Sequence, residues 1–135
     1  MKYVIVREPQ WAVMQFSGHI SGADVICAAN ELSSQSDFDE LRYVVVDFSE
    51  VSEQSIDKST IDDVAAIRIG ARVSNPNIRL ALVATDPSVA SLAARLDTVA
   101  DVGERRMEVF SSVAKARDWL GQQPTLAEIR RFASK

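Results

Sequence analysis

The chain has 135 residues, of which 47% are hydrophobic and 25% are charged, as is typical of a soluble globular protein with one core. Its net charge of −4 argues against nonspecific nucleic-acid binding as its main role. No apolar run approaches the roughly 20 residues that span a bilayer. Because the single cysteine, Cys27, also excludes an internal disulfide, we expect a cytoplasmic protein.

The charge is distributed unevenly along the chain. Residues 1–56 contain three basic and nine acidic side chains, whereas residues 57–135 contain twelve basic and ten acidic ones. The acidic excess is concentrated between Glu31 and Glu53, where Arg42 is the only cation. This segment is either ordinary solvated surface or a face for a basic partner.

The N-terminal part of the chain predicts an antiparallel hairpin. Two short segments rich in β-forming residues, 2–7 and 11–16, flank a turn that contains Pro9. We expect Gly18 to end the second of these strands.

The first helix is predicted over residues 22–34. Ser21 and Asp24 have the spacing of a capping box, and apolar side chains follow them at helical intervals. Cys27 falls in the apolar part of this helix, where we expect a small buried side chain. The polar residues 33–40 are predicted to form a loop.

The strand that the sequence predicts most clearly covers residues 42–48. Its β-branched run is apolar up to Asp47, which fits a central position in a parallel sheet. A polar loop then leads to Ser59 or Thr60 at the start of the next helix. The Asn-Pro-Asn segment at residues 75–77 ends that helix.

The second half of the chain continues the alternation of strands and helices. The predicted elements are a strand over residues 78–84, a helix with Asp86 as its N-cap, a strand over 107–110, and a last helix that Ser111 or Ser112 caps and Gly121 ends.

The element order ββαβαβαβα indicates a single α/β domain over residues 1–121. We expect a mixed, mostly parallel sheet with an N-terminal antiparallel hairpin and about four flanking helices. Residues 122–135 form a C-terminal tail, in which a capping box at Thr125 predicts a short amphipathic helix. Its apolar face must be buried on the body of the domain or in a homodimer, through Leu126, Ile129 and Phe132.

The sequence provides few residues for catalysis. His19 is the only histidine, and no nucleophile elbow, phosphate-binding loop or zinc-ligand pattern accompanies it. We therefore expect no enzyme, no metal and no cofactor, since an enzyme would need His19, Asp47 and Asp57 to converge in space. Asp47 is either a ligand-binding group at the end of a strand or a carboxylate that braces the following loop.

Ser59 has two interpretations. A serine followed three residues later by an acid, here Asp62, is a common helix N-cap. A phosphate on the same hydroxyl would also be tolerated, because its negative charge would meet the positive end of the helix dipole. The chemistry of these residues favours the helix cap as the role of Ser59, and phosphorylation stays the alternative.

Three segments carry a resemblance to a known family: Gly18–Ser21 before the first helix, Val44–Ser49 at the strand end, and Ile56–Ser59 before the second helix. Over roughly residues 2–121 the sequence resembles the SpoIIAA-like, STAS-type family of anti-sigma factor antagonists, as a divergent member. The resemblance implies a regulatory domain that binds proteins. It also implies that Ser59, beside Asp57, corresponds to the serine that a kinase phosphorylates in partner-switching members.

The second helix opens differently from the family's Asp-Ser-Ser-Gly-like segment. Lys58 replaces a small residue, and Thr60 stands where glycine is expected. The loop between Asp47 and Asp57 is also longer than usual. The closing strand and helix are closer to a divergent branch of the family, which is similar in fold to CRAL-TRIO lipid-binding domains.

The sequence therefore predicts a non-enzymatic, cytoplasmic regulatory domain that acts through a protein partner and does not bind nucleic acid. We expect the partner surface and candidate phosphorylation site to involve Asp47, Ser49, Asp57, Ser59 and Thr60. The alternative is a small-molecule or lipid-binding domain with an apolar pocket between the sheet and the helices at residues 60–74 and 87–102. Small residues in the second of these helices would leave room beside the sheet.

Overall fold

The sheet of the computed structural model, which describes residues 2–100 and 107–121, has five strands. They lie in the order β1 (Tyr3–Glu8), β2 (Trp11–Ser21), β3 (Tyr43–Ser55), β4 (Arg79–Val83) and β5 (Met107–Phe110). β1 pairs antiparallel with β2, and the other neighbouring strands pair in parallel. This arrangement confirms the predicted α/β fold with its mixed sheet and N-terminal hairpin.

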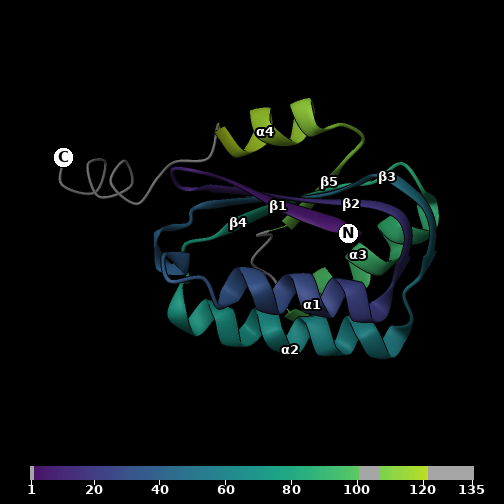
Figure 1. The fold of residues 1–135 in the computed structure, drawn as a ribbon, viewed down its shortest axis with the longest axis horizontal. Helices are drawn as coiled ribbons and strands as arrows, with labels where there is room; N and C mark the ends of the chain where they lie inside the picture. Colours follow the sequence, from purple (N-terminus) through teal and green to yellow (C-terminus); the bar gives the residue numbers. More distant parts are fainter. Residues whose placement is uncertain (1, 101–106, 122–135) are drawn as a thin grey trace.

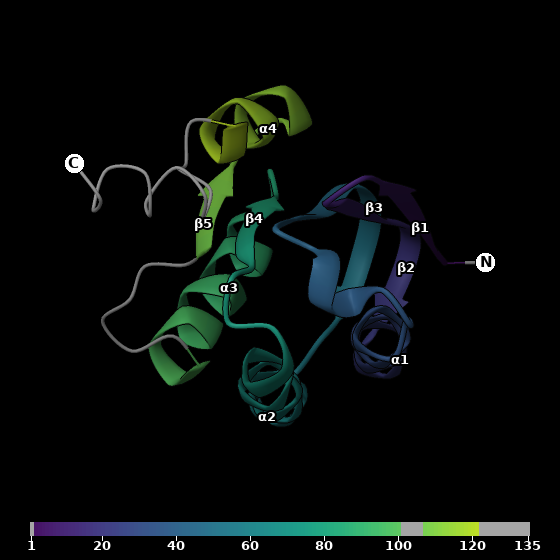
Figure 2. The ribbon, with the colours of Figure 1, turned by 90° about the vertical axis from the view of Figure 1, so that its left-hand side faces the viewer.

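The helices cover the two faces of the sheet unequally. α1 (Gly22–Ser33), α2 (Lys58–Ser74) and α3 (Pro87–Ala100) lie on one face, and α4 (Val113–Gly121) lies on the other (Figures 1 and 2). No helix within the described ranges is long and apolar enough to cross a membrane. The tail at residues 122–135, with its expected helix and dimer contact, lies outside the described residues.

Side chains alternate along each strand and so form two apolar clusters, one on each face of the sheet. On β2, Met14 and Phe16 belong to the cluster beneath α1 and α2, whereas Val13 belongs to the cluster beneath α4. The ring of Phe16 stacks on that of Phe48 with centroids 4.8 Å apart. This contact joins β2 to β3 on the face that three helices cover.

An arginine holds α4 on its face of the sheet. The Arg117 guanidinium lies 4.6 Å from the centre of the Trp11 ring and donates to both carboxylate oxygens of Glu8, at 2.9 and 3.0 Å. These bonds hold the pKa of the Glu8 carboxyl below its usual value. Because Glu8 and Trp11 flank the hairpin turn, the contact ties the last described helix to the first two strands.

β2 and β3 both continue beyond the ends that the sequence predicts. β2 runs through Gly18 to Ser21, and β3 runs through the predicted polar loop to Ser55. The polar residues stay extended because each strand supplies hydrogen-bond partners for the other's backbone. Gly18 has a φ of 74°, and the register shifts beside it, so the strand is irregular there but does not end.

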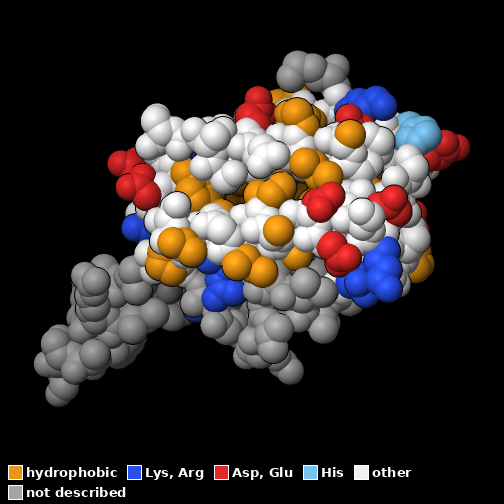
Figure 3. All heavy atoms as spheres, turned by 90° about the horizontal axis from the view of Figure 1, so that it is seen from below, with side chains coloured by type: hydrophobic (Ala, Val, Ile, Leu, Met, Phe, Trp, Pro, Cys, Tyr) orange, Lys and Arg blue, Asp and Glu red, His pale blue; other side chains and the backbone are white. Residues whose placement is uncertain are grey.

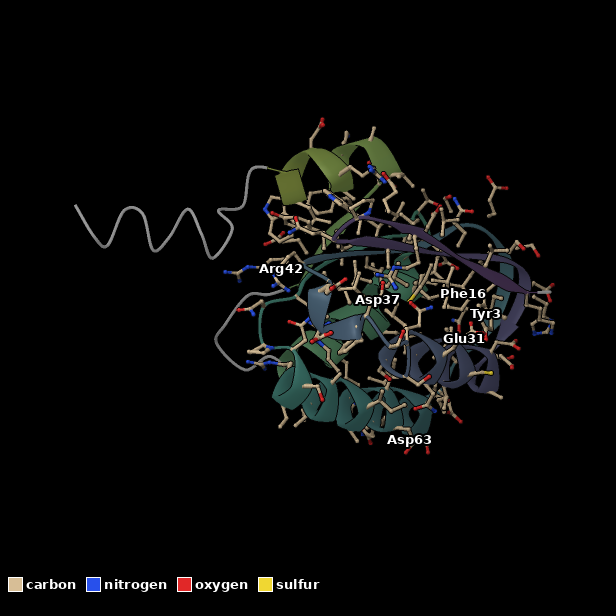
Figure 4. All side chains as sticks on the ribbon, turned by 60° about the vertical axis from the view of Figure 1, so that its left-hand side comes forward. Tyr3, Phe16, Glu31, Asp37, Arg42 and Asp63 are labelled. Carbon is tan, nitrogen blue, oxygen red and sulfur yellow. The ribbon has the colours of Figure 1, made fainter. Side chains whose placement is uncertain are left out.

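The connection between α1 and β3 is more ordered than the predicted loop. A 3₁₀ turn at Phe38–Glu40 buries the Phe38 side chain. Asn75, which ends α2 as predicted and is only 2% exposed, donates from Nδ2 to the carbonyl oxygen of Phe38 at 2.8 Å. Arg7 on β1 donates to both carboxylate oxygens of Asp37, at 2.8 and 3.0 Å, and lowers the pKa of that carboxyl. Asp37 lies just before the 3₁₀ turn and is labelled in Figure 4.

The prediction that Cys27 is buried is wrong. Its side chain is exposed and accepts a hydrogen bond from the Tyr3 hydroxyl at 3.4 Å, while the next residue, Ala28, faces the core. The bond to Cys27, followed by burial and the charge of Glu31, raises the pKa of Tyr3. Tyr3, Phe16 and Glu31 lie close together in Figure 4, where α1 passes beneath the hairpin.

The first turns of α1 and α2 approach each other closely. A Cβ atom on Gly22 would overlap the Thr60 hydroxyl and lie 3.1 Å from two carbons of the same side chain. We therefore expect Gly22→Ala to destabilise the fold by about 1–3 kcal/mol, as overpacking of a core does. Gly70→Ala is the control, because its Cβ meets nothing within 4 Å, and it should be neutral or stabilise by up to about 1 kcal/mol.

Urea unfolding of both variants measures this difference. The double variant Gly22→Ala/Thr60→Ala should recover much of the loss, because it removes the atoms that overlap. An unchanged unfolding midpoint for Gly22→Ala would show that the two helices are not in contact at this point.

Candidate functional site

Two strands of the sheet project beyond their neighbours and form what we call the β2–β3 extension, residues Ser17–Ser21 and Glu50–Ser55. The two segments pair in parallel along their length. β1 accompanies β2 only as far as Phe16, and β4 accompanies β3 only as far as Asp47. In Figure 1 the extension curves away from the sheet toward the starts of α1 and α2.

Most side chains of the extension are exposed, although it is anchored to the core. Ile20 is fully buried, and Val51 packs against the same cluster beneath α1 and α2. The exposed residues are Ser17, Gly18, His19, Glu50, Ser52, Glu53 and Ser55. The extension therefore presents a polar surface on two paired strands that are anchored to the core.

Both strands of the extension lead directly into a helix N-terminus. Ser21 caps α1, and its side chain and that of Asp24 form the predicted capping box. Asp57 caps α2 two residues after β3 ends. Because the two strands are paired, the two helix N-termini lie side by side, as the Gly22–Thr60 contact also requires.

The prediction that Ser59 caps α2 is wrong, because Asp57 occupies that position. Its Oδ1 accepts hydrogen bonds from the backbone N–H and the hydroxyl of Thr60, both at 2.8 Å. The backbone bond, followed by the hydroxyl bond, lowers the pKa of Asp57. Thr60 is thereby buried and bonded, whereas Ser59 is exposed in the first turn of the helix.

Asp47 braces the backbone, which was one of its two predicted roles. The side chain is 6% exposed, and its Oδ1 accepts the N–H of Ser49 at 2.9 Å. At about 3.3 Å per residue, the eight steps from Asp47 to Ser55 span roughly 26 Å of strand. Asp57, Ser59 and Thr60 therefore lie together just beyond one end of β3, whereas Asp47 and Ser49 lie near the middle of the strand.

His19 contacts two residues that the sequence did not single out. Its Nε2 lies 3.1 Å from the Ser55 Oγ, and its Nδ1 lies 3.6 Å from a carboxylate oxygen of Glu53. The register that pairs His19 with Glu53 could not be read from a segment predicted to be a loop. From the sequence, His19 would have to lie beside Asp47 and Asp57 if the protein were an enzyme. The structure instead places His19 beside Glu53 and Ser55.

The surroundings of His19 do not favour nucleophilic catalysis. Its side chain is 56% exposed and that of Glu53 is 76% exposed, so water screens the pair and competes for its hydrogen bonds. No three His, Cys, Asp or Glu side chains within residues 2–100 and 107–121 are placed to hold a metal ion. The chemistry that the extension and the adjoining cap of α2 offer is hydrogen bonding and negative charge, from Glu50 and Glu53 on the extension and from Asp57 at the cap.

The solved structures that share this fold include the following two. One is the anti-sigma factor antagonist SpoIIAA in its unphosphorylated form, with a TM-score of 0.59 and 13% identity over 90% of this chain and 99% of that one. The other is a DUF3478-family protein with a SpoIIAA-like fold from Shewanella loihica PV-4, with a TM-score of 0.56 and 17% identity over 87% and 91% of the two chains. No protein-family model and no curated protein matches the sequence. The chain therefore has the SpoIIAA-like fold, as its resemblance implied.

The two possible caps of α2 can be separated by mutation. We expect Asp57→Ala to lower the melting temperature by a few degrees, because it leaves the Thr60 N–H without its acceptor. Ser59→Ala should melt like the wild type, because the cap of the helix is the Asp57 side chain and alanine keeps the backbone of residue 59. Equal losses for the two variants would contradict the assignment of the cap.

A second variant separates charge from capping. Asn is as good a cap as Asp, so Asp57→Asn removes the charge alone. The pKa of Asp57 is lowered in the folded protein, so its charge stabilises the fold fully above the ordinary carboxyl pKa of about 4, and this contribution is lost progressively as the pH falls from there through the lowered pKa of the folded state. The difference in melting temperature between wild type and Asp57→Asn should therefore shrink below about pH 4.

Proposed function

We propose that the chain is a non-enzymatic regulatory domain of the cytoplasm that binds a protein partner through the β2–β3 extension and the first turn of α2. The observation that carries this proposal is the projection of two paired strands past the rest of the sheet. A polar surface held on paired strands loses less conformational entropy on binding than a free loop does. The SpoIIAA-like fold, shared with an anti-sigma factor antagonist, supports the same role.

The charge of the surface favours a basic partner. Glu50, Glu53 and Asp57 are exposed within it, and Lys58 is the one cation in its first helical turn. Charges around an interface accelerate association and select partners more than they add affinity. We therefore expect the association rate to fall as the ionic strength rises.

Capture of a partner from lysate of the native host tests the proposal. The wild-type chain should retain a stoichiometric protein, and the double variant Glu50→Lys/Glu53→Lys should lose it or bind it at least tenfold more weakly. Asp118→Lys is the matched control, since this exposed acid lies on α4, on the opposite face of the sheet. Equal retention by both variants would contradict the proposed surface.

Within this proposal, Ser59 is the residue at which binding is switched by phosphorylation. Its hydroxyl is exposed and is not used as the helix cap, so a kinase could reach it without unfolding the helix. A phosphate there would add nearly two negative charges beside the positive end of the α2 dipole. It would also change the charge of the surface that the partner contacts.

Mass spectrometry of the protein isolated from its native host should reveal a phosphate on Ser59 under at least one growth condition. The buried Thr60 should stay unmodified, because its hydroxyl donates to Asp57. Absence of phosphate under all conditions, together with wild-type partner binding by Ser59→Ala, would remove the switch from the proposal while leaving the binding surface intact.

A further inference from the structure

We infer that the chain binds a medium-chain carboxylate in an apolar cavity on the face of the sheet that α1, α2 and α3 cover. The cavity has a volume of about 150 Å³ and lies between the sheet, α1 and α2. This inference does not rest on the proposed partner surface. A pocket on this side of the sheet was also the alternative that the sequence offered.

The walls of the cavity consist of apolar side chains from the sheet and from the three helices that cover this face. The sheet supplies Phe16, Val44 and Leu82, and α1 supplies Val25 and Leu32. α2 forms the opposite wall with Val64, Ile67 and Ala71, and the start of α3 contributes Val89 and Leu92. Figure 3 looks onto this face and shows hydrophobic side chains gathered around a hollow between α1 and α2.

The neutral polar groups that line the cavity are already bonded within the chain. The Ser33 hydroxyl donates to the carbonyl oxygen of Ala29 at 3.0 Å. The Asn75 amide donates to Phe38, and its Oδ1 accepts the N–H of Asn77 at 3.1 Å. The cavity opens to solvent, but its apolar walls offer water few of the two to four polar partners that hold it in place, so an apolar molecule displaces such water readily. The interior therefore favours a hydrocarbon chain over water.

Two cations on α2 indicate that the head group of the ligand is an anion. Arg68 and Arg72 both line the cavity, and they lie one helical turn apart on the same face. Both already have partners in the chain. A guanidinium has five N–H donors, so it can bind a carboxylate while keeping an existing bond, and its planar shape suits that group. An apolar chamber beside two arginines thus fits an aliphatic carboxylate better than a neutral lipid or an amine.

The volume limits the length of the chain. A cavity of about 150 Å³ accommodates a molecule the size of benzene, so we expect a buried tail of about six to eight carbons. Octanoate is therefore the probe of choice. Its neutral analogue, 1-octanol, has the same tail and no charge.

Calorimetric titration of the full chain with octanoate at neutral pH tests the inference. We expect saturable binding of one octanoate, weakened at least tenfold by the double variant Arg68→Gln/Arg72→Gln. Arg79→Gln is the control, because this arginine lies on β4 and does not line the cavity. The affinity for 1-octanol should differ by less than twofold among the wild type, the arginine double variant and Arg79→Gln.

A second variant tests the cavity itself. Ala71→Phe should fill it and abolish binding of both probes, and circular dichroism shows whether this variant is folded. If it does not fold, octanoate-induced shifts of the Val64 and Ile67 methyl signals in the wild-type protein replace it. Absence of octanoate binding, or equal binding by the arginine double variant and the wild type, would overturn the inference.

Discussion

The parallel pairing of β2 with β3 is the constraint on which the rest of the structure depends. It runs from the hairpin turn to the starts of α1 and α2, so it fixes the position of both helices as well as the centre of the sheet. Because the strands end together, the two caps, Ser21 and Asp57, lie side by side, and only a glycine fits between the helices at residue 22. The candidate surface and one end of the cavity are both consequences of this ladder.

Local chemistry was enough to predict most of the elements. The apolar run at Val44–Val46 predicted a central strand, and the capping box at Ser21 predicted the start of α1, because each signal lies within a few residues. The strand character of Glu50–Ser55 could not be predicted this way. These polar residues are extended because Ser17–Ser21 pairs with them, and that partner lies some thirty residues away in the sequence.

The candidate site shows the same division between local and distant causes. Asp57 and Thr60 are joined by a local hydrogen bond, and the sequence selected both residues, although it assigned the cap to Ser59. The contacts of His19 with Glu53 and Ser55 depend on the register of two distant strands. The cavity likewise depends on how α1 packs beside α2. Ile56 and Ile61 line the cavity and flank the cap of α2. The cavity and the proposed partner surface therefore share the start of α2.

Amide hydrogen exchange of the free protein tests the central claim most directly. If Ser17–Ser21 and Glu50–Ser55 form a continuous ladder, the amides that bond between them should exchange at least a hundredfold more slowly than in an unstructured peptide of the same sequence. Exchange of both segments at the unstructured rate, with Val44–Val46 still protected, would show that the ladder ends where the sequence predicted. The proposed surface would then lose its support.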